Sequence, residues 1–247
     1  MSNSEDDRRV CLLTGAGGLL GSTLCALWQE TYSILAVCGS RLPPVNSQLI
    51  SVVDPLDPNK PHNSDVYVVK ADLAKDEELE RIVDIALARY GTIDLLINNA
   101  VHSVWNPIVD SDTLMASAGK QFEINVVVPM KLSRIIAKRF WQKEGRHRNL
   151  QMNRHVLNVS SIAAVKVYEN QGQSVYAASK AALNQATLHM ASEFSRFGVR
   201  VNAVAPNSFP GVIPTEAVVE HMRRLDGTTD TGRILLVDAL QKANVQT

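Results

Sequence analysis

The sequence has no excess of charge of either sign, since its 247 residues carry 25 Lys and Arg against 25 Asp and Glu. Proteins that bind nucleic acid through its phosphates usually have a basic surplus, so we expect no nucleic-acid partner. No apolar run reaches the roughly 18 residues that a membrane helix needs. The acidic start MSNSEDDRRV lacks the apolar core of a signal peptide. We therefore expect a cytoplasmic protein with no membrane partner.

Cysteine is also scarce: the three residues are Cys11, Cys25 and Cys38, and they have no metal-ligand spacing. The six histidines are scattered, so no metal site is expected. The cysteines lie in apolar stretches, which favours buried thiols in a reducing compartment. With 45% hydrophobic residues, the composition is that of a globular protein rather than a disordered chain.

Apolar runs of strand length alternate with longer helical patterns along the chain. Strands are predicted over 10–14, 33–38, 66–70, 93–97, 155–159, 199–204 and 233–237. Because these runs are continuously apolar, they are typical of a parallel sheet that is covered on both faces. The alternation predicts a doubly wound α/β fold, the Rossmann fold, of about seven strands. We expect a single domain over 1–247, with 1–8 flexible and 240–247 a tail.

The intervening segments are predicted to be mostly helical. Helices are expected from the glycines near 18 to about 30 and over 76–90, 115–141 and 175–197. Pro129 lies inside the third of these and should kink it, or lie where a missing donor is tolerated. The proline-rich stretch 42–65 is interpreted as a loop, and the basic, polar stretch 141–154 as an inserted, solvated loop.

The first strand runs into the glycine-rich segment TGAGGLLG, residues 14–21. A glycine turn that leads into a helix N-terminus can hold a pyrophosphate, because the unpaired N–H groups point at the ligand. Gly15 would permit the turn, Gly18 the approach of the cofactor, and Gly21 close packing of helix and strand. No Gly-Lys-Ser/Thr follows, so the segment is not a P-loop.

The residues after the second strand bear on cofactor choice. A dinucleotide site often has a carboxylate there for the ribose 2′-hydroxyl. Here the strand ends Cys38-Gly39-Ser40-Arg41, without an acid. A cation suits a 2′-phosphate, so we expect NADP(H) in preference, with NAD(H) possible. Arg41 could equally be a solvated loop residue.

Tyr176 and Lys180 are four residues apart, which places them on one helix face. A tyrosine that exchanges protons near neutrality must have its pKa lowered from about 10, and a nearby ammonium acts in that direction. With this pair the sequence resembles the short-chain dehydrogenase/reductase family from about residue 9 to 237. The matching motifs, in order, are TGAGGLLG, ADL (71–73), NNA (98–100), FEIN (122–125), NVSS (158–161), YAASK (176–180), RVNAVAP (200–206), PGVIPT (210–215) and LLVDA (235–239).

The resemblance implies the roles of individual residues. Tyr176 would be the catalytic acid/base, Ser161 would polarise the substrate carbonyl, Lys180 would bind the nicotinamide ribose and lower the tyrosine pKa, and Asn125 would hold a relay water. Asn98 would lie along the adenosine side, with Ala100. The other implied cofactor-binding residues are Thr14, Gly15, Gly18, Leu19, Leu20, Gly21, Ser40, Arg41, Asp72, Leu73, Asn99, Pro206, Ile213 and Thr215, together with Tyr176 and Lys180.

The sequence departs from the family pattern at several places. Leu19 gives the glycine motif the spacing TGxxGxxG, which is typical of the extended subfamily, whereas the rest is of the compact type. The segment from Ser161 to Tyr176 is about two residues longer than usual, and Asn207 begins an insertion after RVNAVAP. Few residues separate Thr215 from Gly232, so the lid over the substrate should be short.

We therefore expect an NADP(H)-dependent oxidoreductase that interconverts a ketone or aldehyde and an alcohol by hydride transfer. One alternative is a cofactor-binding regulatory protein with little activity, and another is a sugar-nucleotide epimerase or dehydratase. The family resemblance implies a homodimer or homotetramer that acts on a small-molecule carbonyl or alcohol. Trp105 is expected either to line the substrate pocket or to be an ordinary packed aromatic.

Overall fold

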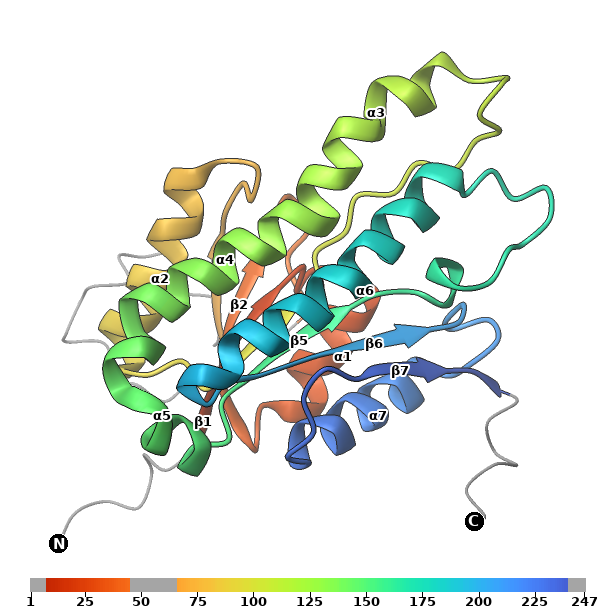
Figure 1. The fold of residues 1–247 in the computed structure, drawn as a ribbon. Helices are drawn as coiled ribbons and strands as arrows, with labels where there is room; N and C mark the ends of the chain where they lie inside the picture. Colours follow the sequence, from red (N-terminus) through yellow and green to blue (C-terminus); the bar gives the residue numbers. More distant parts are fainter. Residues whose placement is uncertain (1–7, 45–65, 240–247) are drawn as a thin grey trace, which may run out of the picture.

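A computed structural model describes residues 8–44 and 66–239 of the chain, and its core is one parallel sheet (Figure 1). The order of its strands is β3-β2-β1-β4-β5-β6-β7. They are β1 (Arg9–Thr14), β2 (Tyr32–Cys38), β3 (Val66–Lys70), β4 (Leu95–Asn98), β5 (His155–Val159), β6 (Arg200–Pro206) and β7 (Ile234–Val237). All neighbours are parallel. The strand order reverses between β1 and β4, which is where a doubly wound sheet binds its ligand.

Helices cover both faces of the sheet, as the continuously apolar strands predict. They are α1 (Leu19–Trp28), α2 (Asp76–Tyr90), α3 (Asp112–Phe122), α4 (Val128–Ile136), α5 (Gln142–Gln151), α6 (Ser174–Phe194) and α7 (Thr215–Gly227). One apolar cluster joins the sheet to α2, α4 and α6, and a second joins it to α1 and α7. In Figure 1, α3 continues the line of α4 and projects beyond the sheet.

The predicted fold class is confirmed, and the strand boundaries agree within about two residues. The predicted helix over 115–141 is wrong in its continuity and its start. It begins at Asp112, and π-helical turns at Glu123–Val127 and Ala137–Trp141 interrupt it. Pro129 lies in the first turn of α4, directly after a π-helical turn. Its missing N–H is tolerated at that position because the π-helical turn before it interrupts the regular α-helical hydrogen-bond pattern.

The prediction of a solvated loop over 141–154 is also wrong, because α5 occupies most of it, with a break in helical geometry at Gly145. The amide of Asn149 explains the order of this polar segment. Its side chain is buried and donates to the carbonyl oxygens of Trp141 (2.8 Å) and Phe197 (2.6 Å). A buried amide that satisfies two carbonyls fixes the helix against the core without an apolar stripe.

Some expectations fall outside the described residues, namely residues 1–7 of the N-terminal segment, the C-terminal tail and the greater part of the proline-rich stretch. Within the described ranges, no helix is both long and apolar enough to cross a membrane. The same ranges contain no group of three or more His, Cys, Asp or Glu side chains that could hold a metal ion.

Candidate active site

A cleft of about 740 Å³ opens at the carboxyl ends of the strands, where β1 meets its neighbours. Five predicted cofactor-binding residues line it: Gly15, Ser40, Asp72, Leu73 and Ala100. The sequence analysis missed two lining cations, Lys70 and Lys120. Lys70 is the last residue of β3 and pairs in register with Cys38, so its place beside the end of β2 follows from strand pairing.

The glycine turn forms a close-packed cradle at the start of α1. Gly15 has φ +69°, and a Cβ there would lie 2.7 Å from the Ala100 Cα. A Cβ on Gly21 would lie 2.3 Å from the Gly15 carbonyl oxygen, so helix and turn touch as predicted. Gly18 is exposed, and a Cβ there would have only one contact within 4 Å, at 3.4 Å. No side chain caps α1, which leaves its first N–H groups for an anion.

Sequence reasoning overlooked the role of Gly17. A Cβ at this position would lie 1.9 Å from the carbonyl oxygen of Arg41, so the segment after β2 lies directly on the glycine turn. The signal in the sequence was the first glycine of the GG pair, but the atom that it contacts belongs to a residue 24 positions away. The Arg41 side chain is exposed.

Hydrogen bonds connect the glycine turn to the segment after β4. The Thr14 hydroxyl accepts from the backbone N–H groups of Asn99 and Ala100, both at 3.1 Å. The Asn99 amide in turn donates to the carbonyls of Thr14 and Gly15, both at 3.0 Å. Asn98 has a different place: it is buried and donates to the Asn158 side chain (2.9 Å), so it joins two strands instead of lining the cleft.

Tyr176 and Ser161 meet at the ends of α6 and β5. Tyr176 is half-buried in the first turn of α6, and the Ser161 side chain lies close enough to its hydroxyl to influence the pKa of the phenol. Ser161 also accepts from the backbone N–H of Ala163 at 3.2 Å, which fixes its orientation. Burial raises the pKa of Tyr176, and the nearby Ser161 hydroxyl lowers it by a smaller amount. The longer segment between the two residues has therefore not separated them.

Lys180 lies one turn further along α6 and is 3% exposed. Its Nζ donates to the carbonyl oxygen of Val159 (2.7 Å) and lies 6.0 Å from the centre of the Tyr176 ring. Burial lowers the pKa of Lys180 to about 8, because a charged ammonium is disfavoured away from water. The expected lowering of the Tyr176 pKa by Lys180 is not among the influences on that phenol.

Asn125 lies in the π-helical turn and is fully buried. Its side chain accepts from the backbone N–H of His102 and donates to the His102 carbonyl, both at 2.9 Å. It also donates to Ser179 (3.0 Å), whose hydroxyl donates to the Tyr176 carbonyl (2.7 Å). Asn125 thus ties the segment after β4 to the first turns of α6.

The remaining predicted cofactor-binding residues are not part of the lining of the cleft. Leu19 and Leu20 begin α1, and Leu20 shares an apolar cluster with Ile213. Pro206 ends β6, and Thr215 begins α7 as a buried residue.

Residues 9–226 match the family model described as short chain dehydrogenase. The chain belongs to the short-chain dehydrogenase family. It is therefore an oxidoreductase that acts on CH–OH or C=O groups with NAD(P). Its identity to the 7alpha-hydroxysteroid dehydrogenase of Escherichia coli is 26% over 221 residues, covering 88% of this chain and 77% of that protein. Its identity to the 3-oxoacyl-acyl-carrier-protein reductase of Thermotoga maritima is 31% over 199 residues, covering 80% and 73%.

Solved structures of short-chain dehydrogenases share the fold. One from Burkholderia xenovorans, a putative short-chain dehydrogenase/reductase by its description, has a TM-score of 0.74 at 21% identity, with 96% of this chain and 98% of that chain covered. Another, from Leptospira borgpetersenii with bound NAD+, has a TM-score of 0.73 at 21% identity, covering 96% and 95%.

Proposed function

We propose that this member of the family interconverts a ketone or aldehyde and an alcohol by hydride transfer with NADP(H), and that Tyr176 is its acid/base. The observation that supports this most is the placement of Ser161 close to the Tyr176 hydroxyl at the strand ends, with buried Lys180 and Asn125 beside them. A polarising hydroxyl next to a phenol is the arrangement that carbonyl reduction needs.

In the direction of reduction, a bound nicotinamide would supply the hydride. The Tyr176 hydroxyl would donate its proton to the substrate oxygen, while the Ser161 hydroxyl holds that oxygen with a second hydrogen bond. Lys180 would then assist the return of a proton to Tyr176, because its lowered pKa of about 8 allows it to release one near neutrality. Asn125 would hold the relay path beside Ser179.

The test of this proposal is Tyr176→Phe. The variant should bind NADPH as the wild type does, by nucleotide fluorescence, and its turnover of a carbonyl panel should fall by about a hundredfold or more. Ser161→Ala should lower kcat as well and leave NADPH binding intact. A Tyr176→Phe enzyme with unchanged turnover would refute the role of the phenol.

NADP(H) is the proposed cofactor because the residues directly after β2, Gly39-Ser40-Arg41, include a cation and no acid. Ser40 and Lys70 line the cleft there, and Arg41 follows Ser40. Asp72 also lines this end, and its carboxylate accepts from the backbone N–H of Ala74 at 3.1 Å. Titration with NADPH and NADH should give the lower Kd for NADPH, and Lys70→Gln should reduce the difference. Tighter NADH binding would contradict the preference.

A regulatory protein with little activity is the second candidate, supported by the short segment between Thr215 and Gly232, most of which is α7. Tight NADPH binding without turnover of any carbonyl compound would favour it over the enzyme.

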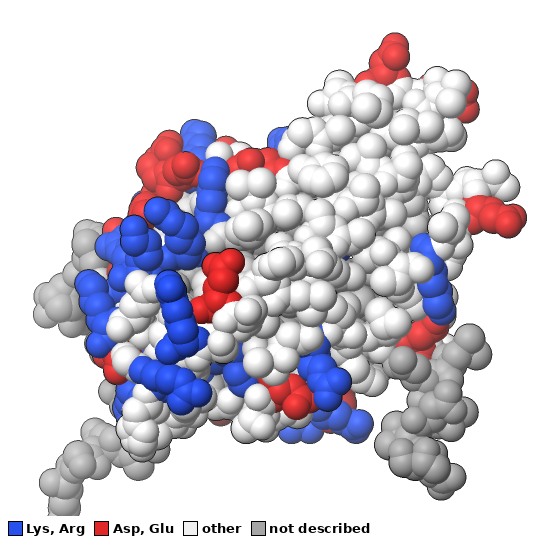
Figure 2. Space-filling model, in the orientation of Figure 1, with Lys and Arg blue, Asp and Glu red and all other residues white. Residues whose placement is uncertain are grey.

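We also propose that the protein is a homodimer or homotetramer that associates through α4 and α6. Figure 2 shows a face without charged side chains over α3 and α6. Within α6 from Ser174 to Ser192 the only Lys, Arg, Asp or Glu is Lys180, which is buried. Four large apolar side chains of α3, α4 and α6 are exposed: Met115, Phe122, Met130 and Leu188. Analytical ultracentrifugation of Met130→Lys with Leu188→Lys should show smaller species than the wild type.

A cytoplasmic location is proposed on the three cysteines. Each of them is buried and unpaired, which suits a reducing compartment.

A further inference from the structure

Trp105 lies beside the ring of Tyr176. The two ring centres are 5.8 Å apart with an angle of 52° between the planes. Trp105 comes from the segment that follows β4, and 50% of its surface is exposed. A substrate whose carbonyl oxygen accepts a proton from Tyr176 must therefore have part of its remaining structure near the exposed Trp105 ring.

The backbone fixes Trp105 in this position. The next residue, Asn106, donates its N–H to the carbonyl of Gly172 at 2.9 Å, just before α6 begins. Gly172 has φ +61°, and a Cβ there would lie 2.4 Å from the Asn106 carbonyl carbon. Only glycine permits this approach, so the loop that carries Trp105 is fastened to the helix that carries Tyr176.

The loops around Tyr176 expose many large apolar side chains, although Asp110, Lys166 and Glu169 are exposed on them too. They comprise residues 99–111, 160–173 and 207–214, and they hold seven of the fifteen exposed large apolar side chains of the described chain. These seven are Val101, Trp105, Ile108, Val109, Val165, Val167 and Val212. An exposed apolar rim around a site marks the surface that a ligand covers.

The same loops offer no free cation. Their only Lys or Arg is Lys166, and it is ion-paired with Asp238 at 2.8 Å. His102 stays neutral near pH 7, because burial and Lys120 lower its pKa. A substrate phosphate or carboxylate would therefore find no charged partner on these three loops.

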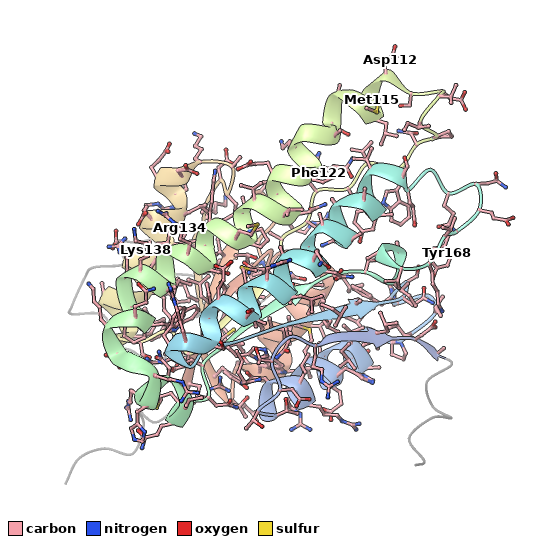
Figure 3. The ribbon with its side chains drawn as sticks, in the orientation of Figure 1. Asp112, Met115, Phe122, Arg134, Lys138 and Tyr168 are labelled. Carbon is pink, nitrogen blue, oxygen red and sulfur yellow. The ribbon has the colours of Figure 1, made fainter. Side chains whose placement is uncertain are left out.

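Hydrogen bonds hold the second and third loops together, and Figure 3 shows Tyr168 in the loop before α6. The Tyr168 hydroxyl donates to the side-chain oxygen of Asn207 (3.1 Å), and the Asn207 amide donates to Asp238 (3.1 Å). Asp238 also binds Lys166. Two of the departures from the family pattern, the longer segment from Ser161 to Tyr176 and the insertion that begins at Asn207, thus meet in one hydrogen-bond network. This network holds the two loops together on one side of the site.

We propose that the substrate is an uncharged ketone or alcohol with an aromatic or alicyclic body that stacks on Trp105, and that phosphorylated and carboxylated substrates are rejected. This rests on the proposed oxidoreductase function of Tyr176. Trp105 then determines specificity: it binds the body of the substrate while Tyr176 and Ser161 act on the oxygen.

The test uses acetophenone, butan-2-one and 4-acetylbenzoate as substrates with NADPH. Acetophenone should have a kcat/KM at least about tenfold above either of the others, since it gains the aromatic contact without a charge. In Trp105→Ala the ratio of kcat/KM for acetophenone to kcat/KM for butan-2-one should fall about tenfold, because the KM for acetophenone rises. Trp105→Phe should keep most of the ratio, and Leu27→Ala, which removes an exposed apolar side chain from α1, should keep all of it.

The outcomes separate the substrate class from the reaction. Two results overturn the proposed substrate class but leave the proposed reaction intact. One is a higher kcat/KM for 4-acetylbenzoate than for acetophenone, and the other is an equal loss of kcat/KM for acetophenone and butan-2-one in Trp105→Ala. Absence of all turnover contradicts the reaction, and fluorescence then tests the class by itself. Because Trp28 and Trp141 are buried, acrylamide quenching reports on Trp105. In the presence of NADP+, acetophenone should reduce the quenching of Trp105 fluorescence by acrylamide. Unchanged quenching overturns the proposal.

Discussion

His155, the first residue of β5, should control the acid stability of the protein. Its ring is fully buried at the end of the sheet opposite the site. Nδ1 lies 2.9 Å from the Asp226 carboxylate, and Nε2 lies 2.9 Å from the side-chain nitrogen of Asn202. Asn202 is oriented by its own bonds to Asp230 and Arg233. Since that nitrogen only donates, Nε2 accepts, and the ring is neutral with its proton on Nδ1.

The environment of His155 disfavours protonation of the neutral ring. Burial lowers the pKa of His155 to about 4; Arg200 of β6 and Arg9 of β1 add to this, and Asp226 opposes it. Asp226 is held ionised, because the bonds from His155 and Arg9 keep its carboxyl pKa below the ordinary value although burial raises it. Tyr32 of β2 donates to the same carboxylate at 2.6 Å.

The sign of the pH effect follows from the lowered pKa. Between pH 6.5 and 4 the unfolded chain binds a proton at His155 that the folded chain does not. The stability contributed by this residue is therefore complete above pH 6.5 and is lost as the pH falls toward 4. With these two pKa values, the loss is about 2 kcal/mol between pH 7 and pH 5 and about 3 kcal/mol over the whole range.

The assay is urea unfolding at pH 7 and pH 5, at one protein concentration, for the wild type and His155→Asn. The variant keeps a donor for Asp226 and removes the titrating ring. Its free energy of unfolding should fall by about 2 kcal/mol less than that of the wild type between the two pH values. His189→Asn, which changes an exposed histidine of α6, should behave as the wild type. Equal losses in the wild type and His155→Asn would refute the reasoning.

Two further variants test the geometry of the site. Gly17→Ala places a Cβ against the Arg41 carbonyl, so NADPH affinity should fall by about tenfold or more by fluorescence titration; Gly119→Ala, with open space around it, should leave the affinity unchanged. Asn125→Ala removes the partners of the His102 backbone and should lower the free energy of unfolding in urea by about 2 kcal/mol. An unchanged free energy of unfolding in Asn125→Ala would contradict the inference that Asn125 holds the segment after β4 against α6.

The fold was predictable because its strands are buried on both faces. Such strands must be apolar throughout, and 155–159 or 66–70 can be recognised without knowledge of their neighbours. The segment 142–151 could not be, since its order depends on Asn149 reaching two distant carbonyls and not on an apolar stripe. Hydrophobic periodicity shows which face of a helix or strand is buried. It does not show whether a polar side chain such as Asn149 will meet hydrogen-bond partners from distant parts of the chain.

The same division applies to the site. The spacing of Tyr176 and Lys180 correctly places them on successive turns of α6, but spacing does not tell how deep each side chain lies. Lys180 extends inward to Val159, so burial dominates its pKa and that of Tyr176. Trp105 could be suspected only as an aromatic near NNA; its contact with Tyr176 depends on the approach of Asn106 to Gly172, which are 66 residues apart.

The two ends of the parallel sheet have opposite electrostatic organisation, and α7 connects them. At the amino ends of the strands, buried charges are paired around Asp226, near the end of α7. At the carboxyl ends, the cleft and the apolar loops leave polar and apolar groups open for ligands. α7 runs between these two ends: Thr215 begins it as a buried residue, and Asp226 is its next-to-last residue. The ion pairs of Asp226 with Arg9, His155 and Arg200 therefore fix the last turn of α7 against the amino ends of β1, β5 and β6, while its first turn lies toward the carboxyl ends.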